Sequence, residues 1–91
     1  MAVREFIICY KEYSLMPNKW QEAVFSQEWP YESGFPEQII EQYLEDTPKC
    51  FVVKFYIKYD AKTSTDDQLR FKAQENARSV LKQHLPGAVV L

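Results

Sequence analysis

The pattern of hydrophobic and polar positions predicts a strand near the start of the chain, over residues 3–10. This stretch is apolar on both parities, and its apolar positions are Phe6, Ile8 and Tyr10 on one side and Ile7 and Cys9 on the other. A strand that is apolar on both faces is usually central in its sheet or covered by helices. We therefore expect residues 3–10 to form a central strand.

A second strand is predicted over residues 50–59, which are rich in β-branched and aromatic side chains. One face of this strand carries Phe51, Val53, Phe55, Ile57 and Tyr59, and the other carries Cys50, Val52, Lys54, Tyr56 and Lys58. We expect helices to cover the first face. The second face begins apolar and becomes amphipathic, so it is a candidate for contact with a partner.

Three helices are predicted from helical periodicity and end signals. Residues 18–28 form a short helix with Asn18 as its N-cap, although Trp20, Glu22 and Val24 also alternate as in an extended chain. Residues 36–46 form a second helix. Residues 65–85 form a third, which begins with a capping box between Thr65 and Gln68. A short last strand is predicted over residues 88–91.

These elements indicate a single α+β domain over residues 1–91, built as a small two-layer sandwich in β-(α)-α-β-α-β order. Its helices are expected on one face of a three- or four-stranded sheet. Strands joined by helices should lie parallel, with right-handed crossovers. If part of residues 11–25 is extended, a split βαβ or ferredoxin-like sheet results.

Charge is distributed unevenly along the chain. The formal net charge is −2, but residues 1–46 hold three basic and nine acidic groups, whereas residues 47–91 hold eight basic and four acidic groups. Residues 20–48, which we call the acidic segment, contain no Lys or Arg. Their seven carboxylates are Glu22, Glu28, Glu32, Glu37, Glu41, Glu45 and Asp46. This distribution disfavours direct nucleic-acid binding, which needs clustered cations.

The composition also restricts the compartment and the chemistry. Cys9 and Cys50 lie in separate strands and are expected to be reduced core residues, because two isolated cysteines are neither a disulfide framework nor a zinc signature. Neither a signal peptide nor a membrane span is apparent, so a cytoplasmic location is expected. His84 is the only histidine, and no partner residue marks it as a general base. No cofactor or metal is predicted.

Aromatic side chains are interspersed in the acidic segment, which distinguishes it from a disordered acidic tail. Glu37, Glu41 and Glu45 recur every fourth residue and would share one face of the predicted helix over residues 36–46. That face is either a solvated surface or a docking face for a basic partner. Large rings are common anchors at protein interfaces, although each could instead pack over the small core.

We therefore predict a small non-enzymatic regulator, inhibitor or adaptor that docks a basic protein partner through residues 20–46. The expected contacts are Trp20, Glu28, Trp29, Tyr31, Glu32, Glu37, Glu41, Glu45 and Asp46. An alternative hypothesis is a cofactor-free dimeric α/β protein that binds or converts a small hydrophobic ligand in an aromatic pocket. The candidates for that pocket are Tyr10, Trp20, Tyr56 and His84. Self-association through a sheet face or edge is compatible with either hypothesis.

Overall fold

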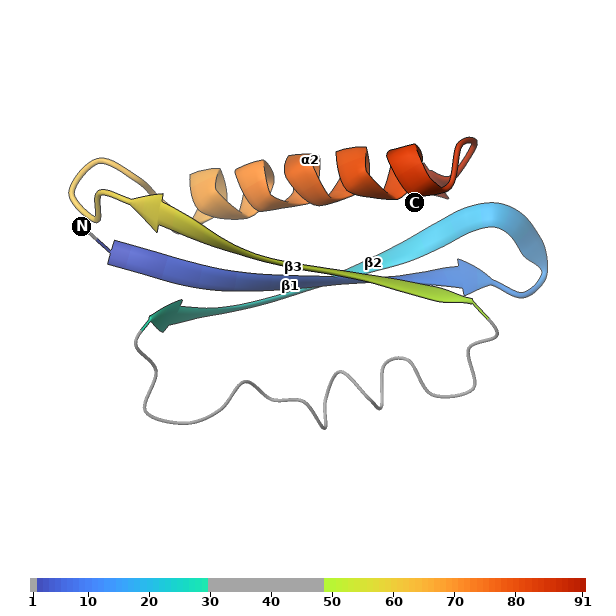
Figure 1. Cartoon of the computed structure of the whole chain (residues 1–91), viewed down its shortest axis with the longest axis horizontal. Coiled ribbons are helices and arrows are strands. Elements are labelled where there is room, and N and C mark those ends of the chain that lie inside the picture. Colours follow the sequence, from blue (N-terminus) through green and yellow to red (C-terminus); the bar gives the residue numbers. More distant parts are fainter. Residues whose placement is uncertain (1, 30–48) are drawn as a thin grey trace.

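The computed structural model describes residues 2–29 and 49–91, without the side chains of residues 27–29. Over these residues the fold is α+β, with one helix packed on a curled four-stranded mixed sheet (Figure 1). The elements are β1 (Ala2–Tyr13), β2 (Met16–Trp29), β3 (Cys50–Tyr59), α2 (Asp66–His84) and β4 (Val89–Val90). The predicted α+β class and the upper count of four strands are confirmed. The helix predicted over residues 36–46 lies outside the described residues.

The sheet has the order β3-β1-β2-β4, so the first strand is central, as predicted. β1 pairs antiparallel with both β2 and β3, and β4 pairs parallel with the start of β2. β3 and β4 therefore run in the same direction, and α2 carries the chain from one to the other across β1 and β2. The expected parallel direction holds for this helix-linked pair. It is wrong for β1 and β3, and the ferredoxin-like order is also wrong.

The main error concerns residues 18–28, which form most of strand β2 and not a helix. β1 and β2 make a hairpin in which Tyr13 is paired with Met16, and its register shifts just before this turn. Asn18 lies beside this irregularity with a φ of 66°, a left-handed conformation that Asn adopts more readily than most residues. Its backbone N–H donates to Glu12 Oε2 at 3.3 Å. Asn18 therefore belongs to a strand irregularity and caps no helix.

Helix α2 follows the sequence prediction closely. Thr65 is its N-cap, and the capping box with Gln68 is formed by both hydrogen bonds, of 3.2 and 3.0 Å. The buried positions are Leu69, Ala73, Ala77 and Leu81, which recur at helical spacing along one side. The small alanines in the middle of this stripe allow the helix to approach the sheet closely.

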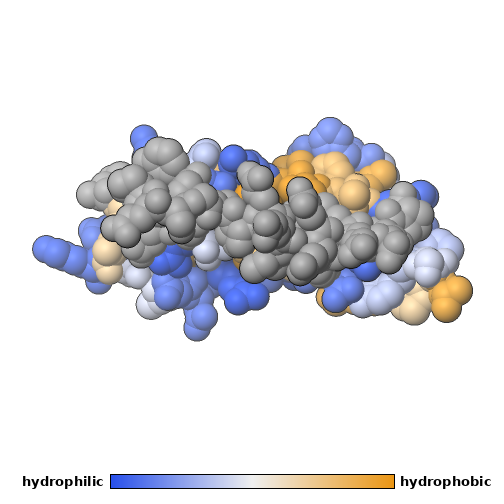
Figure 2. Space-filling view, turned by 90° about the horizontal axis from the view of Figure 1, so that it is seen from below, coloured by the Kyte–Doolittle hydropathy of each residue, from blue (hydrophilic) through white to orange (hydrophobic). Residues whose placement is uncertain are grey.

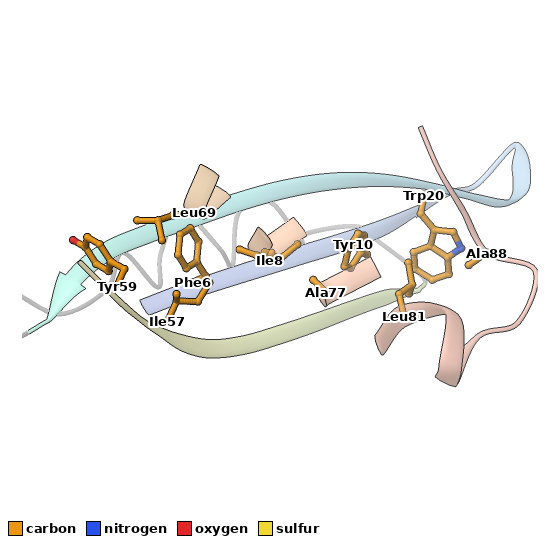
Figure 3. Close-up of a cluster of buried hydrophobic side chains, with 11 residues drawn as sticks. Phe6, Ile8, Tyr10, Trp20, Ile57, Tyr59, Leu69, Ala77, Leu81 and Ala88 are labelled. Carbon is orange, nitrogen blue, oxygen red and sulfur yellow. The ribbon is translucent and has the colours of Figure 1, made fainter. Parts of the chain in front are cut away.

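The core fills the space between α2 and the sheet (Figure 3). Phe6, Ile8 and Tyr10 form its central row on β1, and all three are buried. Trp20 lies at one end of the row beside Leu81 and Ala88, and Ile57 and Tyr59 of β3 lie at the other end with Leu69. The helix thus covers the side of β3 that the sequence predicted.

The other side of the sheet, which we call the outer side, differs between strands. On β1, Glu5, Ile7 and Cys9 are buried. On β3, every second residue from Cys50 to Lys58 is exposed. Cys50 was expected in the core with Cys9. Both cysteines lie on the outer side of the sheet. Cys50 is exposed because it begins the edge strand β3, whereas Cys9 lies in the central strand β1 and is buried.

Candidate functional site

The most developed polar cluster joins β1, β2 and α2 around the carboxylate of Glu22. Tyr10 Oη donates to Glu22 Oε2 at 2.8 Å, and Gln74 Nε2 donates to Oε1 at 2.8 Å. The Arg78 guanidinium donates twice, from Nε to Oε2 at 2.9 Å and from Nη2 to Oε1 at 2.8 Å. Each oxygen of the carboxylate therefore accepts two hydrogen bonds. We refer to these four residues as the Glu22 cluster.

Local structure explains why these residues meet. Glu22 is paired with Tyr10 across the β1–β2 ladder, so both side chains point to the helix side of the sheet. Gln74 and Arg78 are four residues apart on α2, so they lie on the same side of the helix. The bidentate geometry suits the fixed fork of an arginine, and a lysine at position 78 could not reproduce it.

Burial and hydrogen bonding act in opposite directions on the Glu22 carboxyl. Burial alone would raise its pKa, but the hydrogen bonds from Arg78, Tyr10 and Gln74 outweigh burial and hold the pKa below its usual range. Burial, followed by the hydrogen bond to Glu22, raises the pKa of the Tyr10 hydroxyl far above its ordinary value. The hydrogen bonds to Glu22 raise the pKa of Arg78. At neutral pH the cluster therefore contains an ionised pair and a neutral phenol.

This arrangement stabilises a conformation and is not suited to proton transfer. A general acid or base needs a pKa near the working pH, and the pKa values of Glu22 and Tyr10 are shifted away from neutrality. The Glu22 side chain is only 6% exposed, whereas that of Arg78 is 44% exposed. The cluster therefore fastens α2 to β2. The sequence alone did not reveal it, because Glu22 and Arg78 are 56 positions apart.

A shallow pocket of about 230 Å³ lies along the side of α2 next to this cluster. Its lining among the described residues is Phe71, Gln74, Glu75, Arg78, Ser79 and Lys82. The volume is below the roughly 300–1,000 Å³ that is usual for small-molecule sites. Phe71 is 67% exposed, so this ring forms part of the surface and not of the core.

A second polar group lies on the outer side of the sheet. Lys54 Nζ lies 3.6 Å from the buried Glu5 Oε1 and 6.0 Å from the centre of the Tyr56 ring. Glu5 and Tyr56 are directly paired across β1 and β3, which brings both within reach of Lys54. A charged pair and an exposed ring therefore occupy the outer side of β3. Among the described residues that are visible from the side opposite the helix, the most hydrophobic lie mostly in the half of the molecule that carries the β1–β2 turn (Figure 2).

The structure describes little of the surface that the sequence predicted for a partner. Trp20 is 3% exposed and belongs to the core, so it is not available as a surface anchor. Glu28 and Trp29 lie in β2, but their side chains are outside the described part of the chain. The remaining predicted contacts also lie outside the described residues, and they are Tyr31, Glu32, Glu37, Glu41, Glu45 and Asp46.

The four residues expected to line an aromatic pocket are not gathered at one place. Tyr10 and Trp20 are buried beneath α2, whereas Tyr56 is 52% exposed and lies on the outer side of β3. The His84 ring contacts Phe51, with 5.5 Å between the ring centres. These four side chains therefore do not form a common cavity.

Other signals of function are sparse. No three potential metal-binding side chains come together within the described ranges 2–29 and 49–91. The one helix that the structure describes lacks the long apolar stretch that is needed to span a membrane. No protein-family model, curated protein or solved structure matches the chain.

Proposed function

We propose that this protein is a non-enzymatic regulator, inhibitor or adaptor that docks a basic protein partner through its acidic segment. The observation that carries this proposal is the separation of charge. Residues 30–48 hold five carboxylates and no cation, whereas the rest of the chain holds eleven cations and eight carboxylates, a net charge of +3. A surface of one sign steers an oppositely charged partner and fixes its orientation.

The structure around Glu22 reduces the set of residues that can belong to the proposed docking surface. Glu22 is neutralised by Arg78 and almost fully buried, so it is not part of the surface that a partner would contact. Trp20 is excluded for the same reason, because it packs in the core. The remaining carboxylates of the proposed surface are Glu28, Glu32, Glu37, Glu41, Glu45 and Asp46, with Trp29 and Tyr31 as candidate anchors.

The topology supports the proposal because of where residues 30–48, the later part of the acidic segment, are attached. β2 ends at Trp29, opposite Val3, and β3 begins at Cys50, opposite Lys11. Residues 30–48 therefore connect opposite ends of the sheet. The residues on either side of this segment belong to β2 and β3, which both pair with the buried strand β1. A docking segment is positioned more precisely when rigid elements hold it.

The test is a charge reversal with a control of equal charge change. In one variant Glu41 and Glu45 are replaced by Lys, and in the control Asp67 and Glu75 on the exposed side of α2 are replaced by Lys. Each variant raises the net charge by four. Both are used as immobilised bait in extract of the native host, beside the wild-type protein, and the retained proteins are identified by mass spectrometry.

We expect a basic protein that the wild type and the control retain and that the Glu41→Lys/Glu45→Lys variant loses. Its affinity, measured with the purified partner, should fall by about tenfold or more, and binding of the wild type should weaken as salt is added. Equal retention by all three folded proteins would contradict the proposal.

A further inference from the structure

The outer edge of β3 is the longest edge that the sheet presents within the described residues. β3 is the terminal strand of the sheet, it is ten residues long, and no described strand pairs with its other side. On the opposite edge, the two-residue strand β4 pairs only with Lys19 and Trp20, and residues 21–29 of β2 leave a slightly shorter edge that no described strand covers. A long edge strand readily pairs with another strand unless something prevents it.

We propose that β3 pairs antiparallel with β3 of a second copy of this chain, giving a two-fold symmetric dimer with one continuous eight-stranded sheet. The inference is independent of the acidic segment and goes beyond the proposed function. A two-fold axis perpendicular to the sheet relates the copies, so both helices lie on the same face of the joined sheet. The residue on that axis pairs with the same residue of the second copy.

Charge selects the register of this pairing. In β3, Lys54 and Lys58 lie on the outer side with Tyr56 between them. If Lys54 were on the axis, it would oppose itself, and if Tyr56 were on the axis, Lys54 would oppose Lys58. Like charges directly opposite each other destabilise a strand pair.

With Phe55 on the axis, both conflicts disappear. Lys54 then opposes Tyr56 of the second copy, which repeats between chains the cation–ring contact that the two residues already make within one chain, at 6.0 Å. Lys58 opposes Val52. The overlap extends over residues 51–59. Only two symmetric registers overlap over nine residues of β3, with Lys54 or Phe55 on the axis, and of these only the Phe55 register avoids a pair of opposed lysines.

The helix side of β3 fits the same register. Phe55 opposes itself, Val53 opposes Ile57, and Phe51 opposes Tyr59, so every cross-strand pair on this side is apolar or aromatic. Phe51, Val53 and Phe55 are only partly buried within one chain, which leaves apolar surface for the second copy to cover. Aromatic and aliphatic cross-strand pairs are among the favourable ones in antiparallel sheets.

The decisive experiment places a charge of either sign opposite Lys54. Because of the symmetry, one substitution at position 56 acts twice in each dimer. Tyr56→Lys places a lysine opposite Lys54, and Tyr56→Glu places a carboxylate there. Tyr56 is 52% exposed, so both variants should fold. Sedimentation velocity over a range of concentrations gives the dimer dissociation constant, and Gln83→Lys and Gln83→Glu on the exposed side of α2 are the matched controls.

We expect the wild type to form a dimer, Tyr56→Lys to raise its dissociation constant by about tenfold, and Tyr56→Glu to lower it. Val52→Lys and Val52→Glu, opposite Lys58, should change it in the same two directions. The Gln83 variants should match the wild type.

A wild type that stays monomeric at its highest soluble concentration would overturn the proposal. So would a dimer that Tyr56→Lys and Tyr56→Glu weaken equally, because that result indicates packing through a sheet face. Circular dichroism spectra and melting curves of the same samples establish that each variant is folded.

Discussion

The two strands that flank β1 hold the helix in different ways. On the β3 side the contact is apolar, through alternate residues from Phe51 to Tyr59 that pack with the core. On the β2 side α2 is fastened by one ionised, fully hydrogen-bonded carboxylate, Glu22. The free edges differ as well, because β4 covers the start of β2 and no described strand covers β3. The two strands that flank β1 therefore contact the helix differently: β3 through apolar packing, and β2 through an ion pair.

Removing apolar volume on the β3 side should have the largest effect. Ile57 is 7% exposed and belongs to the core, so Ile57→Ala should lower the free energy of unfolding by about 2–5 kcal/mol, independently of pH. Val52→Ala, on the exposed side of the same strand, should change it by about 0.5 kcal/mol or less. Urea unfolding at neutral pH measures both. Equal losses would show that the two sides of β3 are not distinguished by burial.

Removing the charge on the β2 side should have a smaller effect that depends on pH. Glu22→Gln should lower the free energy of unfolding at neutral pH by about 1–3 kcal/mol, because it leaves the hydrogen-bonded Arg78 without its anion. The pKa of Glu22 is lowered in the folded state, so its stabilisation is present above the unfolded-state pKa of about 4.3. That stabilisation is lost as the pH falls through the folded-state pKa.

The free energy of unfolding of the wild type and of Glu22→Gln is therefore measured over a series of pH values. The difference between wild type and Glu22→Gln should be constant near neutral pH and shrink progressively below about pH 4.3. Glu75→Gln, which changes an exposed carboxylate on the same helix, is the control and should stay within about 0.5 kcal/mol of wild type at neutral pH. A pH-independent loss in Glu22→Gln would mean that the carboxylate acts through its shape and not its charge.

The two sides also differ in how well the sequence predicts them. β3 and α2 were predicted almost to the residue, because β3 alternates strictly and Thr65 with Gln68 marks the helix start. Residues 18–28 are predicted as a helix because Asn18 fits an N-cap and the apolar residues fit helical as well as extended spacing. The hairpin turn at Ser14 and Leu15 gives no contrary signal, because it contains none of the glycines typical of tight hairpins. Alternation of Trp20, Glu22 and Val24 was the correct signal.

That error also concealed the Glu22 cluster. Once residues 18–28 are a strand, Glu22 faces the helix beside Trp20 and Val24, and a buried carboxylate then requires a cation nearby. Which cation it takes depends on how α2 lies across the sheet, and periodicity within one segment does not specify this. Trp20 was counted as a possible anchor for the same reason, although the sequence also allowed it to pack over the core.

The contrast between the central strand β1 and the open edge of β3 can be measured directly by residue-resolved amide hydrogen exchange at low and high protein concentration. We predict that amides of Phe6–Tyr10 in β1 are protected at every concentration, because both neighbouring strands bond to this strand. In β3, alternate amides should exchange rapidly in dilute protein and become protected as the concentration rises and a second copy pairs with the edge. Uniform protection of β3 in dilute protein, or rapid exchange that no concentration slows, would contradict the account.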